Sequence, residues 1–247
     1  MTQIDFEAKV AQIRTNLKTV KANVACAAEK SGRNPEEIKL VGVTKLMPLE
    51  TIRAGIEASI RCFGENYPEK AAEKIQALGT DQEIEWHMIG HIQSRKADTV
   101  CKYFDMVHSV DRLKIARYLD RHCREMGKVM PVLIEVNLSS EDSKYGWHAW
   151  DEGCWFEMLF TFREIINFPN IEVRGLMSMP PFFDDPELTR PIYQKLRRLQ
   201  QFLREELPEA KWEELSIGTS FDYEVAVEEG ATMVRVGTDI FGPRSNS

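Results

Sequence analysis

Strand-like and helix-like patterns alternate along almost the whole chain, and this alternation constrains the fold more than any other feature. Short runs rich in β-branched and other apolar residues are each followed by a segment with apolar residues at helical spacing. Strands that alternate with helices pair in parallel through right-handed crossovers. We expect strands at 38–44, 59–64, 84–89, 104–110, 132–137, 171–179, 214–220 and 233–241.

The number of strand and helix units, taken with the chain length, favours a closed barrel. Eight units in 247 residues suit a single (β/α)8 TIM barrel, an α/β fold, and a doubly wound open sheet is the alternative. Residues 3–31 carry apolar side chains at helical spacing ahead of the first strand. We therefore expect one domain over residues 1–247, with a leading helix within 1–32 and the barrel over 38–242.

The charge balance and the cysteine pattern exclude several classes of function. The chain has 32 Lys and Arg against 39 Asp and Glu, a net charge of -7 that disfavours nucleic acid as a partner. No apolar run approaches the roughly 18 residues of a membrane helix, and the first residues are acidic, unlike a signal peptide, so we expect a cytoplasmic protein. The 5 cysteines are scattered without a Cys-x-x-Cys pair, which predicts neither a disulfide framework nor a zinc site.

Small and hydroxyl-bearing residues follow the last two expected strands, where barrels of this type commonly bind phosphate. Ser220 comes after the seventh strand, and Gly237 and Thr238 lie within the eighth expected run. A helix that contains Ala226 follows Ser220, so its free N–H groups would face an anion, and Gly218 would allow close approach. The alternative interpretation is structural, with Gly-Thr-Ser as a helix cap and Gly-Thr as a turn.

Two basic residues are expected to point into the barrel. Lys45 follows the first strand on the same face as Val43, where apolar neighbours would lower its pKa and free its amine for a Schiff base with a carbonyl compound. A solvated surface lysine is the ordinary alternative. Arg235 is expected to face inward on the eighth strand, either to pair with a carboxylate such as Asp239 or to meet a ring nitrogen of the pyridoxal type.

Two further local patterns bear on function. His87 and His91 are four apart but straddle the end of a strand, without a third ligand nearby, so we predict no metal site there. The stretch Trp147–Trp155 holds three tryptophans and resembles an insertion, interpreted as either a surface feature or a patch for a partner.

Several motifs, taken in order, resemble those of the pyridoxal 5'-phosphate homeostasis protein family over nearly the full length of the chain. Any one of them alone is weak, but together they are specific. The matching segments are Val43-Thr44-Lys45 with Pro48, Phe63 to Tyr67, Trp86 to Ser94, Ser143 to Gly146, Gly175-Leu176-Met177 and Val234 to Gly242.

The resemblance implies a barrel of PLP fold-type III, similar to that of alanine racemase, with pyridoxal 5'-phosphate as the cofactor. By the same resemblance, Lys45 forms the aldimine and Asn66 lies against the ring. The phosphate would be held by Ser220, Gly237 and Thr238, while Arg235 faces the pyridine nitrogen. Lys144 matches a second lysine of the family and would serve as an accessory or transfer site.

The chain also departs from the family pattern at a few positions. Thr44 precedes the aldimine lysine where the family usually has serine, and Met47 stands where the family has an accessory lysine. In the seventh strand Thr219 replaces the usual methionine, which alters the pocket wall but keeps Ser220.

The resemblance is compatible with either a carrier of the cofactor or an enzyme that uses it. Racemisation by two bases needs a donor and an acceptor on opposite faces of the substrate carbon, and alanine racemases take the second base from an added domain that we expect to be missing here. We therefore expect a monomeric, non-catalytic carrier without catalytic residues, which holds the cofactor and supplies it to PLP-dependent apoenzymes. The alternatives are a racemase-like PLP enzyme and a cofactor-free barrel that binds a phosphorylated metabolite.

Overall fold

Eight parallel strands close into a barrel in the computed structural model, which describes residues 2–79, 83–139, 141 and 144–243. Each strand pairs with the next along the chain, β9 returns to pair with β1, and β4 pairs with β5. The barrel prediction is confirmed and the open sheet is wrong. The strands are β1 Lys39–Val43, β2 Cys62–Glu65, β3 Glu85–Met88, β4 Met106–Val110, β5 Met130–Asn137, β7 Ile171–Met177, β8 Glu214–Thr219 and β9 Met233–Val236.

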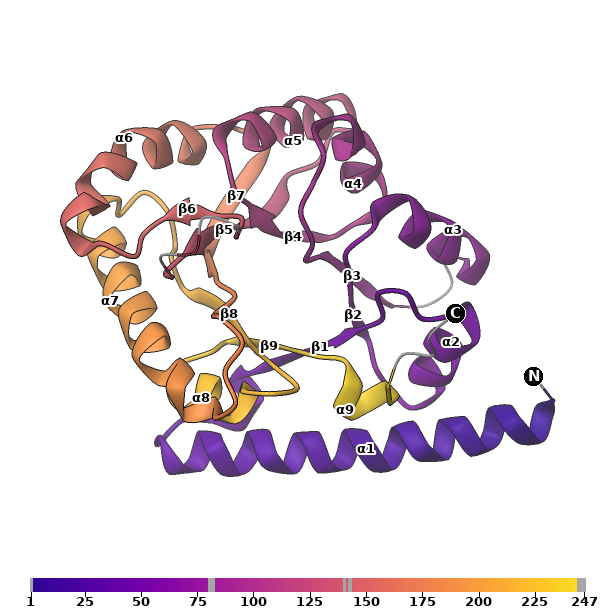
Figure 1. Ribbon diagram of the computed structural model, residues 1–247. Helices are drawn as coiled ribbons and strands as arrows, with labels where there is room; N and C mark the ends of the chain where they lie inside the picture. The colour runs from indigo at the N-terminus through magenta and orange to yellow at the C-terminus, as the bar shows by residue number, and fades with distance from the viewer. Residues whose placement is uncertain (1, 80–82, 140, 142–143, 244–247) are drawn as a thin grey trace.

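Helices surround the strands, as Figure 1 shows in a view along the barrel, and α1 lies across the outside beside α2, α8 and α9. The α-helices are α1 Gln3–Lys30, α2 Leu49–Glu57, α3 Pro68–Leu78, α4 Ala97–Tyr103, α5 Leu113–Glu125, α6 Trp155–Ile166, α7 Arg190–Glu206, α8 Tyr223–Glu228 and α9 Thr238–Phe241. Short 3-10 helices η1 Pro35–Glu37, η2 Ser94–Lys96, η3 Glu152–Cys154 and η4 Pro186–Thr189 complete the connections. Within the described residues, no helix combines the length and the apolar character needed to cross a membrane.

The leading helix α1 agrees with the predicted segment at both ends. Thr2 and Asp5 form a reciprocal capping box, in which each side chain accepts a hydrogen bond from the other's backbone N–H. The helix ends at Lys30, and Gly32 then turns the chain with a φ of 69°. Its apolar face packs against the barrel through Val10, Ile13, Leu17, Val20 and Val24.

Alternate residues of the strands fill the inside of the barrel. An apolar cluster in the interior joins one residue from most of the strands, namely Val41, Cys62, Met106, Leu133, Met177 and Met233. The opposite faces pack against the helices, where the rings of Phe63 and Trp86 stack with their centroids 5.3 Å apart.

The predicted end of the eighth strand is wrong. The eighth strand ends at Val236 rather than at 241, because Gly237 leaves the extended conformation (φ -114°, ψ -75°) and its carbonyl accepts the first hydrogen bond of α9. The stretch Trp147–Trp155 lies in the connection between β5 and α6 and is not one of the eight barrel strands, so its interpretation as an insertion stays a prediction. Its first residues form the short strand β6 (Trp147–His148) beside β5, and Trp155 is buried at the start of α6, with its indole N–H bonded to Ala149.

Candidate functional site

A cavity of about 890 Å³ opens at the end of the barrel where the strands finish. The turns after β1, β2, β8 and β9 supply its polar wall, as expected for a barrel of this class. All six residues predicted for the cofactor site line this one cavity: Lys45, Asn66, Ser220, Arg235, Gly237 and Thr238. The structure thus brings together residues that are up to almost 200 positions apart in the sequence.

Lys45 lies in the turn between β1 and α2 and is half-buried. The residue before it is held by a buried network, in which the Thr44 hydroxyl donates to Glu65 Oε1 at 2.9 Å. Lys74 Nζ lies 2.8 Å from the same oxygen and 3.2 Å from the Thr44 carbonyl oxygen. Sequence reasoning noticed Glu65 as part of a motif but missed Lys74, because a lysine on an amphipathic helix carries no signal that it turns inward.

Asn66 follows β2 and faces the cavity with an incomplete set of hydrogen bonds. Its Oδ1 atom is buried and has no partner. Gly90 packs directly against it, since a Cβ at that position would lie 2.7 Å from the Asn66 Cα and carbonyl oxygen. A buried amide oxygen without a partner is costly, so this atom marks a place where a ligand would complete the site.

The loops after β8 and β9 meet at Ser220, whose hydroxyl accepts from the N–H groups of Gly237 at 3.2 Å and Asp239 at 3.3 Å. Gly218 makes the approach possible, since its φ is 87° and an added Cβ would lie 2.6 Å from the Cβ of Ala226. The turn is also capped locally, because Asp222 accepts from the Thr219 backbone and hydroxyl. The loops therefore have both the structural role and the shape of an anion cradle.

Arg235 is buried, with 4% of its surface exposed, and it lies at the floor of the cavity. It donates to the Ser216 carbonyl at 2.5 Å, to the Ser216 hydroxyl at 2.6 Å and to the Ser178 carbonyl at 3.1 Å. Its Nη2 is also 2.7 Å from the Met179 sulfur. These contacts replace the pairing with Asp239 that the sequence left open, and burial lowers the pKa of the guanidinium.

A chain of hydrogen bonds continues from Arg235 down the inside of the barrel. The Ser216 hydroxyl is 2.8 Å from His108 Nδ1, and His108 Nε2 is 2.9 Å from His87 Nδ1. Burial lowers the pKa of His108 well below its ordinary value, so this imidazole is neutral at pH 7. Sequence reasoning missed the chain, because it joins residues on four strands through side chains that all face the barrel interior.

Glu135 is a second residue of the cavity that sequence reasoning missed. It lies on β5, is buried, and its Oε2 atom has no hydrogen-bond partner. Burial and the nearby Asp111 carboxylate raise its pKa to about 7, while Arg235 and Arg112 act in the opposite direction. An acidic residue inside the apolar run 132–137 was the signal that could have revealed it.

The other residues singled out from the sequence lie around the rim. His91 Nδ1 is 2.7 Å from Asp111, and its ring stacks on Tyr145 at 3.8 Å between centroids, so His91 and His87 have different partners. Lys144 Nζ is 2.8 Å from a Glu141 oxygen and 3.4 Å from the Met179 carbonyl. Ser143, the first residue of its motif, lies outside the described residues.

The arrangement combines four chemical capacities in one cavity. It holds a lysine, a buried guanidinium, a cradle of N–H and hydroxyl groups, and two buried oxygen atoms without partners, on Asn66 and Glu135. Such a set fits a flat polar ligand with an anionic group at one end and a carbonyl that an amine can reach.

The chain is similar in sequence to a known protein family. Alanine racemase, N-terminal domain, matches residues 15–245. A pyridoxal phosphate homeostasis protein of Vibrio alginolyticus is 39% identical over 242 residues, which is 96% of this chain and 100% of that protein.

Solved structures agree with the sequence comparison. PipY of Synechococcus elongatus PCC7942, with PLP bound, superposes with a TM-score of 0.82 and 30% identity over 94% of this chain and 100% of that chain. An alanine racemase of Clostridium difficile 630 shares the fold, with a TM-score of 0.68 and 17% identity over 96% of this chain but 57% of the racemase.

Proposed function

The chain belongs to the alanine racemase N-terminal domain family, among the pyridoxal phosphate homeostasis proteins, and on that premise we propose that it binds pyridoxal 5'-phosphate in the cavity at the carboxyl ends of its strands. One observation carries the proposal. The lysine, the anion cradle and the buried arginine all line the same cavity of about 890 Å³. Two buried oxygens without partners add to the fit.

Each residue has a role that follows from its position. The cofactor, when bound, supplies an aldehyde that condenses reversibly with a primary amine and releases water, and Lys45 provides that amine. Ser220, Gly237 and Thr238 hold the phosphate through hydroxyl and N–H groups. Asn66 orients the ring from the side of β2.

Arg235 sets the electronic character of the bound ring. A guanidinium has only donors and keeps its charge, so a pyridine nitrogen that faces it stays an unprotonated acceptor. An unprotonated ring is a weak electron sink, which suits storage better than carbanion chemistry. The hydrogen bonds from Arg235 to Ser216 and Ser178 hold it in this orientation.

We propose further that the protein is a carrier, which buffers the cofactor and supplies it to apoenzymes without robust turnover of its own. Its relatives are named for the homeostasis of pyridoxal phosphate. Lys144 lies near the rim, in contact with the backbone of Met179, whose sulfur touches Arg235. That position suits a lysine that receives the cofactor on its way out of the cavity.

Cofactor transfer provides the test. The protein is loaded with pyridoxal 5'-phosphate, freed of unbound cofactor and mixed with a PLP-dependent apoenzyme, and the recovery of apoenzyme activity is followed. The same loaded protein is assayed for racemisation of amino acids. If the protein is a carrier, the activity of the apoenzyme should recover. Amino acids should racemise no faster than they do with free cofactor alone.

Two outcomes would overturn the proposal. Racemisation that disappears in Lys45→Ala would establish the racemase-like alternative. A protein that stays colourless with the cofactor and binds a phosphorylated metabolite instead would establish the cofactor-free barrel.

A further inference from the structure

A second cavity, of about 1060 Å³, opens at the other end of the barrel, where the strands begin. Its lining includes the first residues of four strands, Lys39, Cys62, Glu85 and Glu214. None of these residues lines the cavity that holds Lys45. The proposed cofactor function leaves this end of the barrel without a role.

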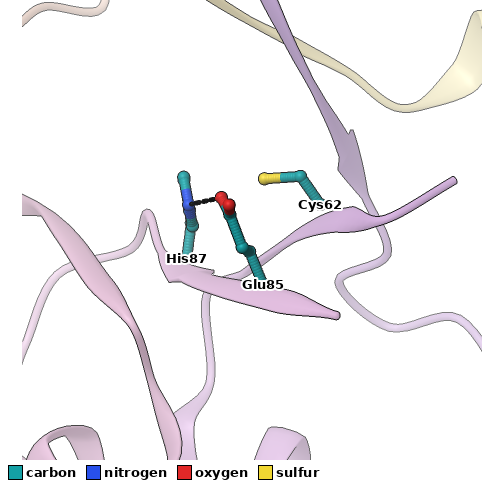
Figure 2. Close-up of side chains that lie close together, drawn as sticks. All are labelled: Cys62, Glu85 and His87. Atoms are coloured by element: carbon teal, nitrogen blue, oxygen red, sulfur yellow. Dashed lines mark hydrogen bonds and ion pairs between the residues drawn. The ribbon is translucent and has the colours of Figure 1, made fainter. Parts of the chain in front are cut away.

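The strand register places three different metal-binding side chains together there. Cys62 and Glu85 are direct partners in the pairing of β2 with β3, and His87 follows on the same face two residues later. Figure 2 shows the three side chains pointing toward one another, with the Glu85 carboxylate between the thiol and the imidazole. One ligand atom from each lies within 4.8 Å of the other two.

We propose that Cys62, Glu85 and His87 bind a divalent transition-metal ion of the zinc type. His87 Nε2 lies 3.3 Å from Glu85 Oε2. Two ligands of one tetrahedral zinc are about 3.3 Å apart when each bond is about 2.0 Å long, so these two atoms already have the spacing that the ion needs. The Cys62 sulfur lies within 4.8 Å of both atoms and would move closer to them to take the third position.

The donor set suits zinc in charge and in kind. A thiolate and a carboxylate together neutralise a divalent ion, and the mixture of sulfur, nitrogen and oxygen disfavours magnesium and calcium, which prefer oxygen alone. The Glu85 side chain is 52% exposed to the cavity, so a fourth position stays open to water or an exchangeable ligand. Three protein ligands with one open position are typical of zinc that reacts or exchanges rather than zinc that only stabilises a fold.

The surroundings of His87 already orient it for this role. Its Nδ1 atom is 2.9 Å from His108 Nε2, and His108 Nδ1 is 2.8 Å from the Ser216 hydroxyl. With metal on Nε2, the proton of His87 sits on Nδ1 and is donated to His108. A second ring or carbonyl that fixes the tautomer of a metal-binding histidine is the usual outer support of such a site.

One contact must open for the ion to enter. Lys39 Nζ is 2.6 Å from Glu85 Oε2 and competes for the carboxylate. The Lys39 side chain is 42% exposed, so it can turn toward solvent at little cost. Glu214 lines the same cavity and has a buried Oε2 without a partner, which offers the displaced ammonium another carboxylate.

Cobalt(II) provides the test, because it binds at zinc sites and its absorption spectrum depends on which ligands hold it. The full chain, freed of metal and cofactor, is titrated with cobalt(II) and then with zinc. We expect one cobalt per chain, a near-ultraviolet charge-transfer band from the thiolate, and visible bands of tetrahedral intensity that zinc abolishes. Cys62→Ser should remove the charge-transfer band, and Glu85→Gln and His87→Gln should each weaken binding at least tenfold.

Matched controls separate this site from chance binding at thiols. Cys26 is exposed and Cys154 is partly exposed, and both lie outside the cavity, so Cys26→Ser and Cys154→Ser should leave the bands unchanged. Circular dichroism confirms that each variant is folded. A charge-transfer band that survives Cys62→Ser, or zinc binding equally tight in Cys62→Ser and the natural protein, would overturn the proposal.

Discussion

His87 Nδ1 lies 2.9 Å from His108 Nε2 inside the barrel, and this contact joins the two ends of the molecule. On one side, His87 reaches Glu85 at the end where the strands begin. On the other side, His108 Nδ1 is hydrogen-bonded to the Ser216 hydroxyl. The same hydroxyl accepts a hydrogen bond from Arg235 at the floor of the proposed cofactor cavity. Arg235 is thus held by a polar chain that spans the barrel interior.

Removing the serine from this chain should weaken both the fold and the site. Ser216→Ala leaves His108 Nδ1 buried without a partner and takes one acceptor from Arg235. An unsatisfied buried group costs about 1–3 kcal/mol, so the free energy of unfolding in urea should fall by that amount. Affinity for pyridoxal 5'-phosphate should fall with it, because Arg235 is less firmly oriented.

A double-mutant cycle tests whether the two residues act together. His108→Phe removes the other partner, so the combined variant with Ser216→Ala should lose less stability than the sum of the two single losses. Additive losses would show that the hydrogen bond between them contributes nothing.

Glu135 should make the stability of the protein depend on pH in an unusual direction. Its pKa is raised from 4.5 to about 7 by burial and by Asp111, so between these values the folded protein binds more protons than the unfolded chain. This contribution is fully present below pH 4.5 and is lost as the pH rises through about 7. The free energy of unfolding should therefore fall by about 2–3 kcal/mol over that window.

Replacement by the neutral amide supplies the control for this effect. Glu135→Gln keeps the shape and cannot titrate, so urea unfolding at about pH 5 and about pH 8 should show a much smaller difference than in the natural protein. An equal difference in both proteins would assign the pH dependence to other groups.

Two glycines with positive φ give a matched pair for the anion cradle. Gly218→Ala places a Cβ 2.6 Å from the Ala226 Cβ and must displace the loop before Ser220, so affinity for pyridoxal 5'-phosphate should fall at least about tenfold. Gly230→Ala has the same kind of backbone (φ 99°) but meets its nearest atom, on the flexible Arg197 side chain, at 3.4 Å. It should cost about 1 kcal/mol of stability and leave affinity unchanged. Equal affinities for the two variants would exclude the cradle as the phosphate site.

Lys74 should be important for the segment that carries Lys45. Lys74→Met removes the ion pair with the fully buried Glu65 carboxylate and leaves Thr44 as its remaining partner. Breaking a buried ion pair by removing one partner costs about 3–5 kcal/mol of stability. We expect a lower melting temperature and weaker cofactor binding. Adding Glu65→Gln should restore most of the stability, since the uncompensated charge is gone. If the double variant is no more stable than Lys74→Met, the charge is not the cause.

The sequence predicts the barrel because strand and helix periods alternate strongly and leave few other topologies. The sequence also predicts that the candidate site residues share one cavity, since Lys45, Asn66 and Ser220 stand at ends of apolar runs, and such ends meet at one mouth of a barrel. The end of β9 was misjudged, because Thr238–Phe241 is apolar enough to continue a strand and only the backbone of Gly237 stops it.

What the sequence does not predict depends on register. Cys62 and Glu85 are 23 positions apart, and no spacing rule joins them until the pairing of β2 with β3 sets them side by side. The sequence therefore directed attention to His87 with His91, four residues apart, whereas the partners of His87 are Glu85 and His108. The sequence does not reveal Lys74 either, because the direction of its side chain depends on how α3 packs on the barrel.

Covalent trapping shows whether Lys45 is the residue that holds pyridoxal 5'-phosphate. The purified protein is mixed with the cofactor, its visible absorption is recorded, the adduct is reduced with borohydride, and the modified peptide is identified by mass spectrometry. We expect a yellow protein with the cofactor trapped on Lys45 in a ratio of about one to one, and no such adduct in Lys45→Arg. Trapping spread over surface lysines, or retained in full by Lys45→Arg, would contradict it.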